Sequence, residues 1–393
     1  MYIAFLNLFI LPMKRILFLF VILFSAQFIS AQVTYKSFNS EKLGAEREIK
    51  IQLPRSYKSS DKSYPIILVL DGDYMFEIVA GNVEYAAYWE DIPEAIVVGI
   101  NEFDKREDDT TYSELNSLPI DGGADFFEFI GMELIPYIEK TYRTEKFKVA
   151  VGHGITANFI NYYLLKEIPL FNAYVSISPE LAPDMQAFLS ERLPNITTKT
   201  FYYLATSKND IAEINTKTVA LHNAIKGIEN KNVLSTFDNF DGPTHYSLPA
   251  HAIPKALESI FFVFKPISKK EYKETILKLD TSPVDYLIEK YDTIEDLFGL
   301  KKQILINDFR AIAAAIKKSE KWEYFEPLGK LARKQYPNTL LGNYYLGRFY
   351  EETGESKKAM KTYQSAYILE EAAGITKDHV LELAEQIKVD FGY

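Results

Sequence analysis

The sequence KFKVAVGHGITANF, residues 146–159, joins a short apolar stretch to an amphipathic one through Gly152-His153-Gly154. An apolar strand that turns sharply into a helix is the layout of a nucleophile elbow, which holds a serine at the end of a sheet in the pattern G-x-S-x-G. In this chain Gly154 stands at the serine position, and Thr156 stands at the last glycine position. The stretch therefore predicts an elbow that lacks its nucleophile.

A glycine at this position is compatible with the fold. The residue in the elbow has a positive φ, which costs a residue with a Cβ about 1–2 kcal/mol and costs glycine little. The change does remove covalent catalysis, since loss of the triad serine lowers turnover on the order of 10⁶-fold in a well-studied protease. We also expect the β-branched Thr156 to alter the packing between the helix and the strands.

Outward from the elbow, strand and helix signals alternate from about residue 33 to residue 265. This alternation predicts an α/β domain, a mostly parallel sheet with helices on both faces, over residues 32–265. Several of the strands are continuous apolar runs, as in strands buried on both faces. The predicted strands are 48–53, 65–70, 95–99, 147–151, 173–178, 200–204 and 233–237, and the predicted helices are 124–141, 156–166, 184–192, 215–227 and 252–262.

The pattern changes after Pro266, where strand signals stop and helical patterns continue to the end. Small and aromatic residues recur there at the offsets of a 34-residue tetratricopeptide repeat. We interpret residues 266–305 as a helical linker and 306–393 as a tetratricopeptide-like domain, although an ordinary helical hairpin fits as an alternative. The residues that match the repeat are Leu346, Gly347, Tyr350, Gly354, Ala359, Tyr363 and Ala366, with Ala332 and Pro337 one repeat earlier.

Residues 1–31 have the features of a secretory signal peptide. Lys14-Arg15 form a basic region, an apolar run follows from Ile16, and small residues precede Gln32. A membrane anchor is the alternative, but the apolar run is shorter than the roughly 20 residues that span a bilayer. The chain contains no cysteine, so it cannot carry disulfides or a lipid on an N-terminal cysteine. We expect a periplasmic or secreted protein with no membrane span once the signal is removed.

The charge of the chain bears on its partners. The formal net charge is −10, and it becomes −12 when the two positive charges of the signal are removed. An acidic surface repels phosphates, which argues against nucleic acid as a partner. The five histidines show no metal-ligand spacing such as H-E-x-x-H, so we predict no metal site and no cofactor.

Five blocks of sequence in a fixed order resemble the bacterial esterase family of α/β hydrolases that includes esterase D and siderophore esterases. The resemblance covers about 230 residues and implies an α/β-hydrolase sheet and, in active members, a Ser–acid–His triad. The blocks are YPIILVLDGD (64–73), GADFFEFIGMELIPYIEKTYRT (123–144), FKVAVGHG (147–154), FNAYVSISPEL (171–181) and DGPTHYSLPAHAIPKALESIF (241–261).

The resemblance assigns roles to residues outside the elbow. His245 matches the family's catalytic histidine, which takes the proton of the serine and returns it to the leaving group. The acid should follow the seventh strand of the family sheet, where Asp210 is our first choice and Glu213 the second. The oxyanion donors should be backbone N–H groups near Gly72-Asp73 and at Ile155. Arg106, together with Asp109, is similar to a family segment that lines the entrance to the site, although a solvated charge run fits equally well.

Two classes of function remain open. In the first, the chain is an exported pseudo-esterase that binds a small ester-like ligand, with helical repeats that bind an envelope protein. In the second, it is an active carboxylic-ester hydrolase that uses His245 with an activated water, or uses Ser178 or Thr156 as an unorthodox nucleophile. Gly154 favours the first, and the retained His245 favours the second.

Overall fold

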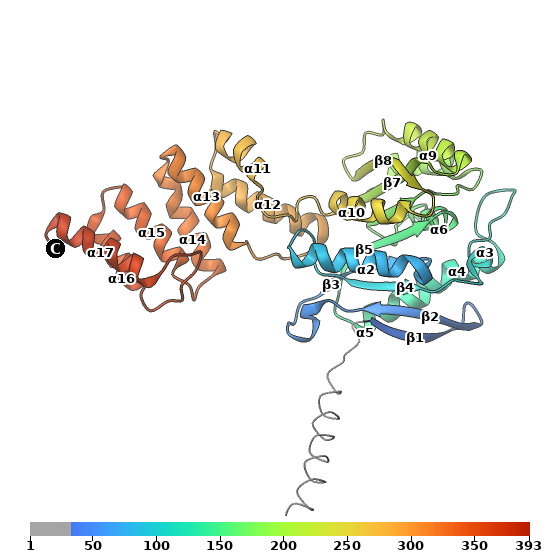
Figure 1. The fold of residues 1–393 in the computed structure, drawn as a ribbon, viewed down its shortest axis with the longest axis horizontal. Coiled ribbons are helices and arrows are strands. Elements are labelled where there is room, and N and C mark those ends of the chain that lie inside the picture. The colour runs from blue at the N-terminus through green and yellow to red at the C-terminus, as the bar shows by residue number, and fades with distance from the viewer. Residues whose placement is uncertain (1–32) are drawn as a thin grey trace, which may run out of the picture.

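The computed structural model describes residues 33–393, so the predicted signal peptide lies outside the described residues. An eight-stranded sheet forms the centre of the first domain, with the strand order β1-β2-β4-β3-β5-β6-β7-β8 (Figure 1). The first two strands pair antiparallel, β2 also runs antiparallel to β4, and all other neighbours are parallel. The strands are β1 (Val33–Ser40), β2 (Ala45–Gln52), β3 (Tyr64–Val69), β4 (Ile96–Ile100), β5 (Thr144–His153), β6 (Ala173–Ile177), β7 (Thr200–Asn209) and β8 (Val233–Thr244).

The central strands are apolar on both sides because both faces of the sheet are covered. Every residue of β3 is buried, and its side chains alternate between two separate cores, as the twofold period of a strand requires. Ile67 and Val69 belong to one core, whereas Ile66 and Leu68 belong to the other. The continuous apolar run of this strand therefore reflects its place in the middle of a parallel sheet.

Helices cover each face of the sheet. One core contains side chains of α2 (Gly72–Tyr88) and α10 (Leu248–Ile260). The opposite core contains side chains of the helices that lie between β4 and β8 in the sequence. These helices are α4 (Asp121–Glu128), α5 (Ile135–Thr141), α6 (Ile155–Phe159), α7 (Asn161–Leu164), α8 (Met185–Arg192) and α9 (Ala212–Ile225).

The structure confirms the predicted fold class and adds elements that the sequence analysis did not assign. All seven predicted strands are present, but β1 at the sheet edge and the long helix α2 were not predicted. The expected continuous helix over 124–141 is interrupted by a π-helical segment, Phe129–Leu134, that connects α4 to α5. The helix expected over 156–166 is likewise divided into α6 and α7.

A helical region follows α10 and continues to the end of the chain (Figure 1). Its helices approach closely where glycines face bulky side chains, since the distance between packed helices depends on the side chains at their contact. A Cβ on Gly347 would lie 2.2 Å from the ring of Tyr363, and one on Gly329 would lie 2.6 Å from Leu346. The helices are α11 (Lys269–Glu274), α12 (Pro283–Phe298), α13 (Ile306–Ser319), α14 (Phe325–Gln335), α15 (Leu341–Glu352), α16 (Ser356–Ser365) and α17 (Lys377–Phe391).

The helical region packs against the first domain through the last residue of α12. Phe298 is 2% exposed, and its ring lies 5.1 Å from that of Phe147, 5.2 Å from that of Phe261 and 5.8 Å from that of Phe201, between centroids. Lys302 donates to the carbonyl oxygen of Phe264 at 2.6 Å. Because Phe147 and Phe201 lie near the starts of β5 and β7, the junction is at the amino ends of the parallel strands.

None of the helices within residues 33–393 combines the length and the apolar character needed to cross a bilayer.

Candidate active site

The residues of the candidate site follow the carboxyl ends of the parallel strands. Asp71 follows β3, Gly154 follows β5, Ser178 follows β6, Asp210 follows β7 and His245 follows β8. In open α/β sheets, ligands bind at the carboxyl ends of the strands. The topology therefore brings residues from distant parts of the sequence to one place.

Gly154 has the backbone conformation expected of an elbow. Its φ is 63° and its ψ is −122°, a region that L side chains rarely adopt, and its N–H donates to the carbonyl oxygen of Ile177 at 3.0 Å. The turn is tight, because a Cβ on Gly152 would lie 2.5 Å from the carbonyl oxygen of Thr156. A Cβ on Gly154 itself would lie 3.8 Å from Nε2 of His245 and 3.2 Å from Nη2 of Arg106.

His245 is oriented by an acid on the side away from Gly154. Its Nδ1 lies 2.9 Å from Oδ1 of Asp210. Burial opposes ionisation of Asp210, but hydrogen bonds from His245, Ser178 and Thr206 outweigh it and lower the pKa of this carboxyl to about 2. An ionised carboxylate only accepts, so Nδ1 of His245 carries a hydrogen, and Nε2 is the nitrogen that faces Gly154. The second-choice acid, Glu213, pairs with Lys217 at the surface.

Neither alternative hydroxyl is placed to attack a substrate. Ser178 donates its hydroxyl to Asp210, and its Oγ lies 2.9 Å from Nδ1 of His245, on the side of the imidazole opposite Nε2. The Thr156 hydroxyl is buried and donates to Asp71 at 2.6 Å. Both side chains therefore support neighbouring groups, which corrects the expectation that Ser178 could approach the reacting position.

Arg106 lies beside Gly154, where its side chain is partly exposed and is held by Asp71. Its Nε donates to Asp71 Oδ1 at 2.5 Å, and its Nη2 donates to Asp71 Oδ2 at 3.1 Å and to the carbonyl oxygen of His153 at 2.8 Å. Asp71 is 1% exposed, so this ion pair is largely withdrawn from water. The expectation of a solvated charge run also fails for Asp109, which forms a buried two-point ion pair with Arg47.

The predicted oxyanion donors lie on the first turns of two helices. Gly72 begins α2 and Ile155 begins α6. Glycine is required at residue 72, because a Cβ there would lie 2.6 Å from the carbonyl oxygen of Ile100. The side chain of Asp73 instead accepts from the N–H groups of Glu102 and Phe103 at 2.7 and 2.8 Å, so it holds the loop after β4 and does not face a ligand.

Three buried groups of the site were not found from the sequence. They are Asp71, which binds Arg106; Glu102, which accepts from the N–H of Asp71; and His153. Burial raises the pKa of the Glu102 carboxyl well above its usual range. The only sequence signal for Asp71 and His153 was their place directly after apolar strands.

His153 is a buried neutral imidazole behind His245. Its Nε2 donates to the carbonyl oxygen of His245 at 3.2 Å, and its Nδ1 lies 2.9 Å from the hydroxyl of Tyr74, which also donates to Asp71 at 3.1 Å. Its ring lies 4.5 Å from the ring of His245, between centroids. Burial, assisted by the nearby positive charge of Arg106, lowers the pKa of His153 to about 3.

We expect His153 to make the fold sensitive to acid. Its pKa is depressed in the folded state, so below about pH 6.5 the unfolded chain binds a proton that the folded chain excludes. The free energy of unfolding should therefore fall by about 2 kcal/mol between pH 7 and pH 5 from this residue alone. Urea unfolding of wild type and His153→Gln at both values measures it, and the variant should lose this part of the decline.

A matched control is His251→Gln, because His251 is exposed. That variant should show the same decline as wild type. Parallel pH curves for wild type and His153→Gln would contradict the assignment of a neutral buried imidazole. Other buried acids such as Glu102 cancel in the comparison, since both proteins contain them.

No metal centre is formed by the part of the chain that the structure describes. Residues 33–393 contain no group of three or more His, Cys, Asp or Glu side chains arranged to hold a metal ion.

The sequence and the fold are both similar to those of known proteins. A family model described as "Putative esterase" matches residues 40–235. The crystal structure of an uncharacterised protein from Capnocytophaga ochracea is similar at 33% identity and a TM-score of 0.84, over 91% of this chain and 100% of that one. This similarity extends over both the sheet and the helical region, because so much of each chain is covered.

More distant structures share the fold. An IroE-like serine hydrolase from Shewanella oneidensis is 22% identical with a TM-score of 0.59, over 77% of this chain and 99% of that one. The BES protein from Bacillus cereus is 24% identical with a TM-score of 0.52, over 59% of this chain and 95% of that one. None of the curated proteins matches the sequence.

Proposed function

Because this chain belongs to the esterase family of α/β hydrolases yet has glycine at the expected nucleophile position, we propose that it is a pseudo-esterase. It uses the esterase cleft to bind a small ester-like ligand without forming a covalent intermediate. The observation that carries the proposal is the position of Gly154, whose Cα faces Nε2 of His245 with no side chain between them. A serine side chain there would complete a Ser–His–Asp arrangement with Asp210.

The other hydroxyls near the site support this proposal. Ser178 donates to Asp210, and Thr156 donates to Asp71, so each hydroxyl hydrogen is already engaged with a carboxylate. A serine or threonine nucleophile must instead give its proton to a base as it attacks. The hydroxyl of neither residue faces Nε2 of His245, the nitrogen that would accept the proton.

A second candidate is hydrolysis by an activated water. It is favoured by the intact pair of Asp210 and His245, whose free Nε2 faces the position of the missing side chain. A water bound at this position would meet a base that is held in the correct tautomer. Such an enzyme would form no acyl intermediate and would not react with serine-directed phosphonates.

The decisive assay is hydrolysis of p-nitrophenyl acetate and butyrate by residues 32–393. We expect no burst of p-nitrophenol, a steady rate equal to that of His245→Ala, and no labelling by a fluorophosphonate, because no activated hydroxyl is present. His251→Ala serves as the matched histidine control. A rate well above that of His245→Ala, still without labelling, would replace the proposal with the activated-water mechanism. Labelling at any serine or threonine would refute both.

We also propose that the protein is exported and that the helical region binds a protein of the cell envelope. The features of residues 1–31 support export, and the paired helices from α13 to α16 support a repeat-like binding module. Intact mass of the chain from its native host tests export, since a chain that keeps residues 1–31 would refute it. Capture from envelope extract by the whole chain, compared with residues 32–265, tests the role of the helices.

A further inference from the structure

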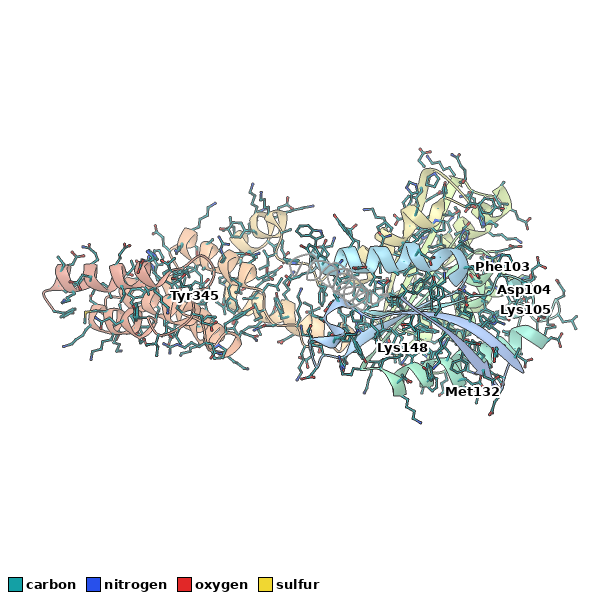
Figure 2. All side chains as sticks on the ribbon, turned by 60° about the horizontal axis from the view of Figure 1, so that its bottom comes forward. Phe103, Asp104, Lys105, Met132, Lys148 and Tyr345 are labelled. Carbon is teal, nitrogen blue, oxygen red and sulfur yellow. The ribbon has the colours of Figure 1, made fainter. Side chains whose placement is uncertain are left out.

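A small pocket lies at the opposite end of the sheet from Gly154. Its volume is about 140 Å³, and it is bounded by the last turns of α2, the end of β2 and the chain that leads into β4. Ala95 lines the pocket and directly precedes β4, so the pocket is at the amino ends of the parallel strands. Figure 2 shows Lys105, next to Arg106 of the candidate active site, at the end of the molecule remote from Tyr345 of the helical region. The pocket is therefore separate from that site.

An amide faces this pocket without a partner. Gln52 is 8% exposed and lines the pocket, yet its side chain makes no hydrogen bond to any of residues 33–393. Ile49 and Ile51 of the same strand enter the core on one face of the sheet, so the alternation of side chains places Gln52 on the other face, under α2. A ligand in the pocket would supply the hydrogen bonds that native proteins normally give to such a buried amide.

Much of the remaining wall is apolar. Its residues come from the loop after β2, from α2 and from the segment before β4, so a ligand body between them would be covered by carbon atoms on several sides. The volume of about 140 Å³ is close to the roughly 150 Å³ of an engineered cavity that binds benzene, so one six-membered ring fits. The apolar residues are Pro54, Val83, Ala87 and Ala95.

The charged groups around the pocket favour a neutral ligand. Nε of Arg55 donates to Oε1 of Glu84 at 2.6 Å, and Oε1 of Glu94 accepts from the N–H of Ser56 at 3.1 Å. These groups are therefore already engaged within the protein. One arginine and two glutamates give the lining a net charge of −1, which repels an anion. A cation would have to compete with Arg55 and Ser56 for the carboxylates.

We propose that this pocket binds a neutral six-membered ring that carries a carboxamide. The side chain of Gln52 presents an acceptor oxygen and N–H donors side by side, and a second amide presents the complementary pair. Two parallel N–H···O bonds can then form between the two amides, while the apolar walls cover the ring. A hydroxyl is the poorer complement, because its single oxygen must serve both groups of Gln52 and aligns well with only one of them.

The mouth of the pocket favours an aromatic ring over a saturated one. Tyr88 lines the pocket and is 63% exposed, and the guanidinium of Arg55 lies 5.7 Å from the centroid of its ring. The ring of Trp89 lies 5.1 Å from that of Tyr88, between centroids, at an interplanar angle of 87°. An aromatic ring that enters beside Tyr88 gains edge or offset contacts of the kind that aromatic pairs prefer.

The test is titration of residues 32–393 with benzamide, followed by tryptophan fluorescence. The chain has two tryptophans, Trp89 beside the pocket and Trp322 in the helical region. Benzamide should change the emission saturably, because it binds next to the rings of Tyr88 and Trp89. The change should persist in Trp322→Phe and disappear in Trp89→Phe. Equilibrium dialysis of benzamide gives an affinity that does not depend on the fluorescence.

Three further compounds measure which features of benzamide are recognised. N,N-dimethylbenzamide lacks the N–H donors, toluene lacks the amide, and benzoate adds a negative charge. Each should bind at least about tenfold more weakly than benzamide, since each leaves Gln52 without a partner or is repelled by the lining. Equal affinity for benzamide and toluene, equal affinity for benzamide and benzoate, or no binding of benzamide at millimolar concentration would overturn the proposal.

Variants locate the site. Gln52→Leu keeps a side chain of similar size without the amide, so benzamide should bind at least about tenfold more weakly while toluene binds no more weakly. Gln186→Leu removes an exposed glutamine elsewhere and should leave both affinities unchanged. Ala87→Leu should weaken both compounds by filling the pocket. A folded Gln52→Leu protein that still prefers benzamide to toluene would refute the role of the amide, and the comparison of compounds on wild type requires no variant at all.

The proposal does not depend on the function proposed for the candidate active site. Because the two sites lie at opposite ends of the strands, His245→Ala should bind benzamide as wild type does.

Discussion

Gly154→Ser is expected to create a reactive serine where wild type has none. The new Cβ would lie 3.8 Å from Nε2 of His245, so the Oγ beyond it can reach the hydrogen-bonding range of about 2.6–3.2 Å. Hydrolysis of p-nitrophenyl butyrate should rise on the order of 10²-fold or more above wild type, well short of the roughly 10⁶-fold that a complete triad supplies. A fluorophosphonate should label residue 154, as located by peptide mass spectrometry.

Recovery should be partial for two reasons visible in the structure. The new Cβ would lie 3.2 Å from Nη2 of Arg106, so that side chain must shift slightly. A residue with a Cβ at φ 63° is also strained by about 1–2 kcal/mol, which should lower stability by a similar amount.

Two variants serve as controls for the serine. Gly154→Ala carries the same strain without the hydroxyl and should gain no activity. Gly154→Ser/His245→Ala keeps the hydroxyl without its base and should lose most of the gain. A folded Gly154→Ser protein that stays unlabelled and inactive would show that the cleft no longer supports a triad, whatever the spacing of its side chains.

Phe298→Ala is expected to cost about 3–5 kcal/mol of unfolding free energy, as for other large-to-small substitutions of buried aromatic residues. The side chain is 2% exposed and packs among Phe147, Phe201 and Phe261, so its removal leaves a cavity between the helical region and the sheet. Guanidinium unfolding followed by circular dichroism measures the change. Loss of the junction should also separate the transitions of the two regions.

The control for this prediction is Phe262, which follows the buried Phe261 in the sequence. Phe262→Ala removes an equally large ring that is 49% exposed, and it should cost less than about 1 kcal/mol. Similar losses in Phe298→Ala and Phe262→Ala would show that the helical region does not depend on this contact for its attachment.

The central sheet was predictable because burial on both faces makes its strands continuous apolar runs. The edge strand β1 carries alternating exposed residues and no such run, so its pairing with β2 could not be inferred locally. Helix α2 was missed because its 17 residues contain two glycines and begin directly after an apolar strand. The π-helical segment within 124–141 depends on tertiary packing and leaves no distinct pattern in the sequence.

The site was predictable where a motif marks a position along the chain, and not where two side chains meet in space. The resemblance supplied Gly154 and His245 and narrowed the acid to Asp210 or Glu213; the structure brings Asp210 to the imidazole. Arg106 follows β4 and Asp71 follows β3, and they meet because these strands are neighbours in the sheet. The order of strands in the sheet cannot be inferred from the spacing of residues along the sequence. The orientation of Ser178 was likewise beyond reach, because it depends on which face of the imidazole its loop approaches.

The junction at Phe298 and the candidate site lie at opposite ends of the parallel strands. The helices join the sheet at the amino ends of its strands, while Gly154, His245 and Arg106 gather at the carboxyl ends. A chain immobilised through Tyr393, on a sensor surface or on a binding partner, would therefore present the candidate site outward to the medium. Attachment through an exposed lysine such as Lys105, beside Arg106, would turn the cleft toward the support and shield it. Tethering at the carboxyl terminus is thus the orientation in which ligand capture and attachment do not compete for the same face.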